Sequence, residues 1–135
     1  MLKIEHLTKK YDQYKAVDDL SLHIERGHIY GFIGHNGAGK TTTLKAVAGI
    51  MPFDEGEIII NGKSMKSHAL ECKQIMAYIP DNPDLYEHFT GIQYLNFVAD
   101  VYQVSKEDRE ERISKYGDMF DLTSDLAQPI SAYSH

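Results

Sequence analysis

Apolar and polar residues alternate over the first part of the chain. Leu2 to Thr8 alternates with the period of a strand, and Ala16 to Ile24 places apolar residues among polar neighbours. Alternation of this kind indicates half-buried β-strands. The polar segment 9–15 predicts a hairpin connection between them. We therefore expect the chain to open with an antiparallel sheet.

Further along, short apolar runs predict three more strands and one helix. The helix is expected over Lys40–Gly49, where apolar residues recur at helical spacing and Gly49 with Pro52 supplies a stop. Asn61-Gly62 is a strong signal for a tight turn. The predicted strands are His28–Ile33, Glu57–Ile60 and Ile75–Ile79.

From about residue 90 the pattern predicts helices only. Thr90 with Gln93 forms a capping box at the start of one helix, and Ser105 caps a second helix. The second helix has an apolar face at Ile113, Tyr116 and Phe120. Before this region, Ser67–Lys73 predicts a short helix in which Cys72 is a small packing residue.

Composition narrows the possible classes of protein. The 135 residues carry a net charge of −6, and 42% of them are hydrophobic, which suits a globular unit with a core. No apolar run approaches the ~18 residues of a membrane span, and no secretory leader is evident. The lone Cys72 forms no internal disulfide, which favours a reducing, cytoplasmic compartment. The acidic balance argues against a nucleic-acid partner, and the seven scattered histidines are not at metal-ligand spacing.

One stretch carries a chemical signature. It has a glycine, four free positions and then Gly-Lys-Thr, the pattern of a phosphate-binding loop, with a predicted strand before it and a helix after it. A simple glycine-rich turn between a strand and a helix is the alternative. The binding residues predicted from the motif are Gly34, His35, Asn36, Gly37, Ala38, Gly39, Lys40, Thr41 and Thr42.

The chemistry of phosphate binding explains these residue types. Glycines let the backbone approach an anion closely, so that main-chain N–H groups surround the phosphates, and the following helix adds the positive end of its dipole. Lys40 is then placed to reach the β- and γ-phosphates. The Thr41 hydroxyl is expected to bind Mg²⁺, and Thr42 to donate on the α-phosphate side.

The phosphate-loop motif, the strand pair before it and the ending Tyr133-Ser134-His135 together resemble the ATP-binding subunit of an ABC transporter over the whole chain. The resemblance implies an α/β phosphate-loop NTPase core with an N-terminal antiparallel β-subdomain and the start of a helical subdomain. Residues 1–89 would be the ATP-binding core with its β-subdomain, and residues 90–135 the helical subdomain. The last core strands of the family are missing from these 135 residues, so the edge at Ile29–Ile33 is expected to be exposed.

The resemblance also implies roles for individual residues. Tyr11 matches the aromatic residue that stacks on adenine in the family; an exposed hairpin tyrosine is the alternative. Asp81 stands where the family usually has glutamine, and its carboxylate would bind Mg²⁺ directly or through water. Tyr86 and Phe89 lie where family members touch the membrane subunit, or they anchor the loop on its own domain.

Tyr133-Ser134-His135 matches the first three positions of the family signature, usually Leu-Ser-Gly, with Tyr and His as departures. Ser134 would contact the γ-phosphate bound by the opposite subunit. The family's apolar strand ending in Asp and followed by a catalytic Glu is absent from this sequence; Phe97–Asp100 is followed by Val101 and reads as helix. No general base is therefore assigned within this chain.

The function implied by the resemblance is ATP·Mg binding, with hydrolysis in the full-length protein driving transport. Its partners would be a transmembrane permease subunit and a second ATP-binding subunit, in a homodimer or heterodimer at the inner face of the cell membrane. Two alternatives stay open: a nucleotide-binding fragment without turnover, and a soluble ABC-type ATPase that does not transport. A GTPase is disfavoured because no Asn-Lys-x-Asp is present.

Overall fold

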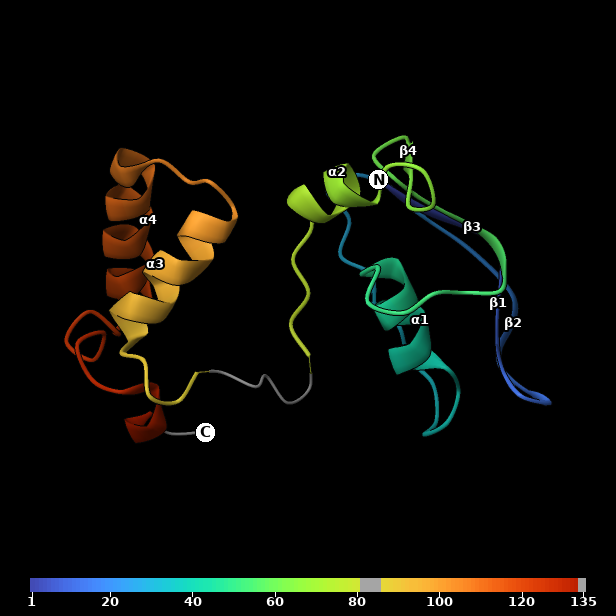
Figure 1. Ribbon diagram of the computed structural model, residues 1–135, viewed down its shortest axis with the longest axis horizontal. Helices are drawn as coiled ribbons and strands as arrows, with labels where there is room; N and C mark the ends of the chain where they lie inside the picture. The colour runs from blue at the N-terminus through green and yellow to red at the C-terminus, as the bar shows by residue number, and fades with distance from the viewer. Residues whose placement is uncertain (81–85, 134–135) are drawn as a thin grey trace. The chain divides into compact units, whose positions relative to one another are not determined.

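The computed structural model describes residues 1–80 and 86–133. The chain divides into two compact units, Met1–Ile79 and Pro80–His135, and each is described by itself (Figure 1). The division falls before residue 90, where the sequence pattern changes to helices only. The assignment of 1–89 to an ATP-binding core and 90–135 to a helical subdomain stays a prediction.

The first unit is built on a four-stranded antiparallel sheet, and the antiparallel pairing predicted for its first two strands is confirmed. Its strands are β1 (Leu2–Tyr11), β2 (Tyr14–Ile24), β3 (Glu55–Ile60) and β4 (Lys63–Ser64), in the order β2-β1-β3-β4. The predicted connection over residues 9–15 is wrong in length. The β1–β2 pairing continues as far as Tyr11 opposite Tyr14, because Asp12 turns the chain in the left-handed region (φ 51°).

The core of this unit lies between the sheet and two helices, α1 (Lys40–Val47) and α2 (Ala69–Gln74). Figure 1 shows α1 beside the sheet. Cys72 is fully buried, as expected of a packing residue, and its burial raises the pKa of the thiol. The other buried members of the core are Ile4, Leu7, Val17, Ala46, Ile58, Ile60 and Met65.

The turn between β3 and β4 confirms the Asn61-Gly62 signal. Both residues have positive φ, 49° and 83°, as a type I′ hairpin turn requires. This turn returns β4 along β3, with Ile60 opposite Lys63.

A line of irregularities crosses the middle of the sheet. His6 in β1 and Asp19 in β2 both have positive φ, and their side chains meet at 2.7 Å between Nδ1 and Oδ1. On the other side of β1, Gly56 of β3 also has positive φ, and a Cβ there would overlap the carbonyl oxygen of His6. Bulges of this kind bend strands and increase their twist. Beyond the bend lie Tyr11 and Tyr14 at the tip of the hairpin.

Two strands predicted from apolar runs do not form. Residues 28–33 and 75–79 have no strand assignment, and Ile29, Ile33 and Ile79 are 103%, 93% and 85% exposed. A strand needs a neighbouring ladder for its N–H and C=O groups. Within the described residues no segment pairs with either run. The exposure of Ile29 and Ile33 agrees with the open apolar edge expected there.

Among its described residues, the second unit contains two α-helices, α3 (Gly91–Val101) and α4 (Lys106–Met119), and a short 3₁₀ helix, η1 (Ile130–Ala132). The predicted capping box is present: the N–H of Gln93 donates to the Thr90 hydroxyl at 3.3 Å, and the N–H of Thr90 donates to the Gln93 side chain at 2.9 Å. Ser105 caps α4 by accepting from the N–H of Asp108 at 3.1 Å.

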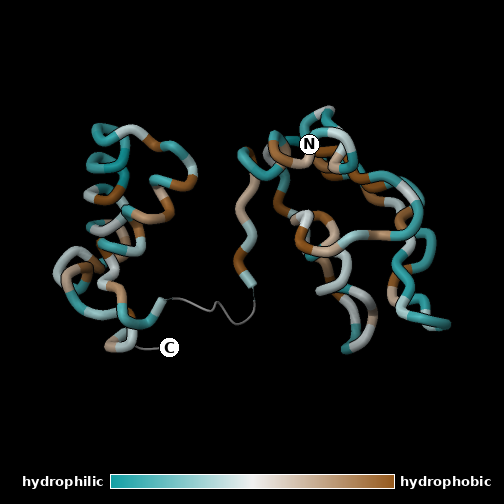
Figure 2. Tube along the Cα trace, viewed as in Figure 1, coloured by the Kyte–Doolittle hydropathy of each residue, from teal (hydrophilic) through white to brown (hydrophobic). Residues whose placement is uncertain are grey.

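The apolar face predicted for α4 is not buried as a whole. Ile113 is half-buried, but Tyr116 and Phe120 are 48% and 66% exposed, and Phe120 lies just past the end of the helix. Figure 2 shows how hydrophilic most of α4 is. One neighbouring helix covers only part of its apolar stripe, because a stripe at helical spacing spans a wide arc.

Candidate nucleotide-binding site

The phosphate-loop motif lies before α1, in a loop that glycines turn at two points. Gly37 (φ 86°) and Gly39 (φ 79°) both adopt the left-handed conformation, which is accessible to glycine without strain. Gly39 is the N-cap of α1 and supplies no side-chain cap. The first N–H groups of the helix, from Lys40 to Thr42, have no acceptor within the described residues. Such a row of unpaired donors is a ready anion site.

The loop is fixed in place by contact with β2. A Cβ on Gly39 would overlap the carbonyl oxygen of Ala16 and lie 3.2 Å from Val17 Cγ2. On the helix side, the buried Thr43 donates to the carbonyl of Gly39 from its N–H at 2.8 Å and from its hydroxyl at 2.9 Å. The sheet and the first turn of α1 therefore hold the loop from both sides.

Lys40 folds back over the loop that precedes it. Its Nζ donates to the carbonyl oxygens of Gly34 at 2.5 Å and His35 at 2.7 Å. These two contacts bring the only cation of the motif to the same loop as the unpaired N–H groups. An anion bound by those N–H groups would compete with the two carbonyls for the ammonium group.

The residues of the motif also fit a magnesium ion. Thr41 is exposed, and its hydroxyl makes no hydrogen bond to any described residue, whereas the hydroxyl of Thr43 is used inside the helix. A hydroxyl oxygen beside bound phosphates is the kind of hard ligand that Mg²⁺ takes, with phosphate oxygens and water completing its shell. Asp81, the other predicted ligand, lies outside the described residues.

His35 and Asn36 form the outer part of the loop. The imidazole Nδ1 of His35 lies 2.8 Å from the carbonyl oxygen of Asn36. Because a carbonyl only accepts, this contact assigns the proton to Nδ1. Both residues are exposed, so neither contributes to the core.

Two tyrosines stand at the hairpin tip. Tyr11, the residue predicted to stack on adenine, is 45% exposed. Its hydroxyl contacts Met51 Sδ at 2.9 Å, and the Lys9 ammonium nitrogen lies 5.4 Å from the centroid of its ring. Tyr14, its cross-strand partner, reaches the loop itself: its hydroxyl lies 3.4 Å from the carbonyl of Gly37. Sequence reasoning missed Tyr14. The sequence carried no signal for it, because the two-residue turn that places Tyr14 opposite Tyr11 was not predicted.

The remaining predicted residues belong to the second unit. Ser134 lies outside the described residues. Tyr86 and Phe89 stack with ring centroids 5.2 Å apart, and both meet the edge of Phe97, at 5.6 and 6.5 Å. Tyr94 joins them at 6.3 Å from Tyr86. We call these four residues the aromatic cluster.

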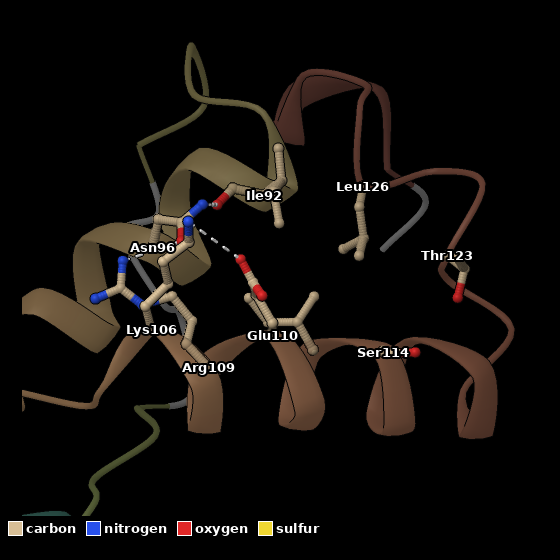
Figure 3. Close-up of a pocket in the computed structure, with 9 residues that line it drawn as sticks. Ile92, Asn96, Lys106, Arg109, Glu110, Ser114, Thr123 and Leu126 are labelled. Atoms are coloured by element: carbon tan, nitrogen blue, oxygen red, sulfur yellow. Dashed lines mark hydrogen bonds and ion pairs between the residues drawn. The ribbon is translucent and has the colours of Figure 1, made fainter.

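A cavity of about 490 Å³ lies in the second unit rather than at the loop. Figure 3 shows it between α3, α4 and the segment that holds Thr123 and Leu126. Both cationic side chains have partners: Arg109 donates to Asn96 Oδ1 at 3.1 Å and pairs with Asp100, and Lys106 lies 3.8 Å from Glu110. The buried Nε of Arg109 has no hydrogen-bond partner among the described residues. The contacts of Arg109 join α4 to α3, whereas the Lys106–Glu110 pair lies within α4, so we assign the cavity a structural role.

Fold and loop together define a nucleotide-binding protein of the phosphate-loop class. A sequence profile of the family described as "ABC transporter" matches residues 17–135. Two relatives from Bacillus subtilis are the uncharacterized ABC transporter ATP-binding protein YhcH, 35% identical over 99% of this chain, and the SkfA peptide export ATP-binding protein SkfE, 36% identical over 84% of it. The chain spans 43% and 46% of their lengths.

Solved structures agree with these sequence relatives. An ATP-binding subunit of an ABC transporter superposes with a TM-score of 0.91 at 31% identity, over 99% of this chain and 56% of that one. A dimeric ATP-binding cassette bound to ADP and Pi shares the fold, with a TM-score of 0.81 at 20% identity, over 99% and 63%. The chain belongs to the ABC transporter family and carries part of its ATP-binding domain. Within the described residues, no helix has the length and apolar character needed to cross a bilayer.

Proposed function

We propose that this domain, in the full-length protein, binds ATP with Mg²⁺ and hydrolyses it to drive transport through a membrane permease. The observation that carries the proposal is the loop before α1. The ammonium group of Lys40 and the unpaired N–H donors from Lys40 to Thr42 both lie at this loop, where they can bind an anion together. Catalysis of phosphoryl transfer depends mostly on such positioning and charge stabilisation.

Each part of the site has a proposed task. The loop from Gly34 to Thr42 surrounds the phosphates, with Lys40 on the β- and γ-phosphates. Thr41 and Asp81 hold Mg²⁺, which neutralises charge that develops on the phosphates. Tyr11 covers the adenine through its ring face. The general base is not among these 135 residues, so it belongs to another part of the full-length protein.

The proposed partners are a permease subunit and a second ATP-binding subunit. The aromatic cluster supports the first: Tyr86 is 55% exposed and Phe97 is 42% exposed, so apolar rings are presented at the surface. The dimeric neighbour structure supports the second. In a head-to-tail dimer Ser134 would contact the γ-phosphate held by the opposite loop, and the assembly would sit at the inner face of the cell membrane.

The test is a titration of the full-length protein with Mg-ATP, comparing Lys40→Ala with Lys45→Ala. Lys45 lies in the last turn of the same helix and serves as the matched control. Hydrogen bonds to charged groups contribute about 1.5–3 kcal/mol, so Lys40→Ala should weaken binding roughly 10- to 150-fold, while Lys45→Ala should bind as wild type. Equal affinities for the two variants would refute the proposal.

Two further outcomes distinguish the alternatives. We propose that the 135-residue chain alone turns ATP over only at background rate, since its sequence has no Asp-Glu strand to polarise the water. Turnover by that chain that Lys40→Ala abolishes would overturn this. A soluble ATPase that does not transport would hydrolyse ATP at a rate that reconstitution with a permease leaves unchanged.

A further inference from the structure

We propose that Asn36 is a site of spontaneous deamidation, through which the phosphate loop loses its affinity for nucleotide when no nucleotide protects it. Asparagine followed by glycine occurs twice in the chain, as Asn36-Gly37 in the phosphate loop and as Asn61-Gly62 between β3 and β4. Both pairs are exposed, but only the first lies at the candidate site. The protection by nucleotide rests on the proposed function; the chemistry at Asn36 does not.

Deamidation needs no partner other than water. The main-chain nitrogen of Gly37 gives up its proton and attacks the side-chain carbonyl carbon of Asn36. The new C–N bond closes a five-membered succinimide ring, and the side-chain amide leaves as ammonia, taking up a proton. Water then opens either carbonyl of the ring and leaves aspartate or isoaspartate. A carboxylate thus replaces a neutral amide, and isoaspartate also adds one methylene to the main chain.

The structure leaves this attack unhindered. Neither the side chain of Asn36 nor the N–H of Gly37 makes a hydrogen bond to any described residue. A Cβ on Gly37 would meet no atom within 4 Å, so the space beside the attacking nitrogen is open. The turn is closed by the N–H of Ala38, which donates to the carbonyl of His35 at 3.2 Å. The side chain and the nitrogen that attacks it are therefore free to approach each other.

His35 assists the loss of the proton from the attacking nitrogen. Its Nδ1 lies 2.8 Å from the carbonyl oxygen of Asn36, and because a carbonyl only accepts, the imidazole donates. That carbonyl belongs to the same peptide group as the N–H of Gly37. A hydrogen bond to the oxygen draws electron density from the nitrogen through amide resonance. It therefore stabilises the deprotonated nitrogen, as a hydrogen bond to the charged form of any acid does.

Asn61 has the same following residue in a different setting. Its N–H donates to the carbonyl of Met1 at 2.9 Å, and its turn is held between paired strands, with Ile60 opposite Lys63. No histidine among the described residues donates to its carbonyl. Turning the backbone of Asn61 for attack would disturb the hydrogen bond to Met1. Asn61-Gly62 is therefore a slower reference site present in every sample.

The product would act directly on the proposed nucleotide site. A carboxylate at position 36 lies in the loop that would hold the phosphates, and like charges repel. Isoaspartate would also lengthen the chain ahead of Gly39, which packs against the carbonyl oxygen of Ala16. Bound phosphates have the opposite effect, because they place negative charge beside the nitrogen that must lose its proton. Nucleotide therefore protects the loop that binds it.

The test incubates the full-length protein at mildly alkaline pH and follows both asparagines by peptide mapping with mass spectrometry. Without nucleotide, Asn36 should deamidate roughly tenfold faster than Asn61, since opening the Asn61 turn breaks a main-chain hydrogen bond. Mg-ATP at about ten times its Kd should slow the loss of Asn36 about tenfold, because only the free loop reacts, and should leave Asn61 unchanged. No loss at Asn36, or equal loss at the two sites, would overturn the proposal.

Variants test the assistance by His35. His35→Ala should slow the loss of Asn36 roughly two- to tenfold, the range expected for one hydrogen bond. His28→Ala, at an exposed histidine outside the motif, is the matched control and should deamidate as wild type. Equal rates in the two variants would refute the role of His35. If His35→Ala does not fold, the comparison of Asn36 with Asn61 in wild type still decides the proposal.

The effect on binding is measured separately. Asn36→Asp reproduces one product and should bind Mg-ATP at least about tenfold more weakly than wild type, whereas Asn61→Asp should bind as wild type. Aged protein that has lost Asn36 yet binds Mg-ATP like fresh protein would overturn the inference. Failure of the proposed function would look different, since fresh wild type would then not bind Mg-ATP although Asn36 still deamidated.

Discussion

Gly39 packs directly against the carbonyl oxygen of Ala16, which leaves no room for a side chain between the phosphate loop and β2. The contact joins a residue of the antiparallel sheet to the N-cap of α1. The sheet therefore supports the loop as well as the core. The same hairpin places the Tyr14 hydroxyl 3.4 Å from the carbonyl oxygen of Gly37, so one supersecondary element contacts the loop at two points.

Replacing Gly39 should damage both folding and binding. In Gly39→Ala the new methyl group overlaps Ala16 O, and alanine is strained at φ 79°, so we expect the free energy of unfolding to fall by about 1–3 kcal/mol. Gly31→Ala is the control, because a Cβ there meets no atom closer than 3.9 Å. Denaturant unfolding and Mg-ATP titration of both variants measure the effect. Wild-type behaviour of Gly39→Ala would show that the loop is not held by β2.

Tyr14 should affect nucleotide affinity through its contact with the loop. Tyr14→Phe removes the hydroxyl that lies 3.4 Å from Gly37 O, and the weak geometry predicts a modest loss of affinity, roughly two- to fivefold. Tyr11→Phe keeps the ring that would cover adenine and loses only the contact with Met51, so its affinity should stay near wild type. Parallel titrations with a fluorescent ATP analogue decide between the two hydroxyls. The reverse order would assign the contact to Tyr11.

Local signals predicted much of the fold. The alternation of apolar and polar residues predicted β1 and β2, and Asn61-Gly62 predicted the turn between β3 and β4. The capping residues Thr90 and Ser105 predicted where α3 and α4 begin. Each of these depends on neighbours within a few residues. The strand predictions for residues 28–33 and 75–79 were wrong. An apolar run becomes a strand only when another strand lies beside it, and the local sequence does not show whether one does.

The part of the candidate site that is formed by consecutive residues could be predicted from the sequence. The phosphate loop could be identified from its motif, since glycine, lysine and threonine occur at fixed offsets along one stretch. The contacts that hold the phosphate loop could not be predicted from the sequence. Ala16 contacts Gly39, and Tyr14 contacts Gly37, only after the hairpin has folded. The bend at His6 and Asp19 carries no sequence signal either, since neither residue is a glycine.

Arg109 should contribute strongly to the stability of the second unit. Its guanidinium donates to Asn96 and to the carbonyl of Val104 and pairs with Asp100, so it joins α4 to α3 and the turn between them. Arg109→Met should lower the free energy of unfolding by about 1–3 kcal/mol, because it leaves the part-buried Asn96 oxygen without a donor. Arg112→Met on the same helix, where Arg112 is exposed, should have little effect. Hydrogen exchange of α3 amides provides the measurement, and equal exchange in the two variants would contradict the role.

The thiol of Cys72 should react very slowly with alkylating reagents in the folded protein. Its side chain is fully buried, and burial raises the pKa of the thiol, so the folded chain holds the protonated form. The thiol ionises at a lower pH in the unfolded chain than in the folded chain. It therefore has no effect on stability below the unfolded pKa, and it lowers stability as the pH rises above that pKa.

Alkylation of Cys72 at pH 8 should be at least about a hundredfold slower in the native protein than in urea, since the reaction requires opening of the core. Cys72→Ser should remove the labelling and destabilise the first unit, because a hydroxyl would replace a packed sulfur among apolar side chains. Rapid native labelling would mean that α2 opens freely from the sheet.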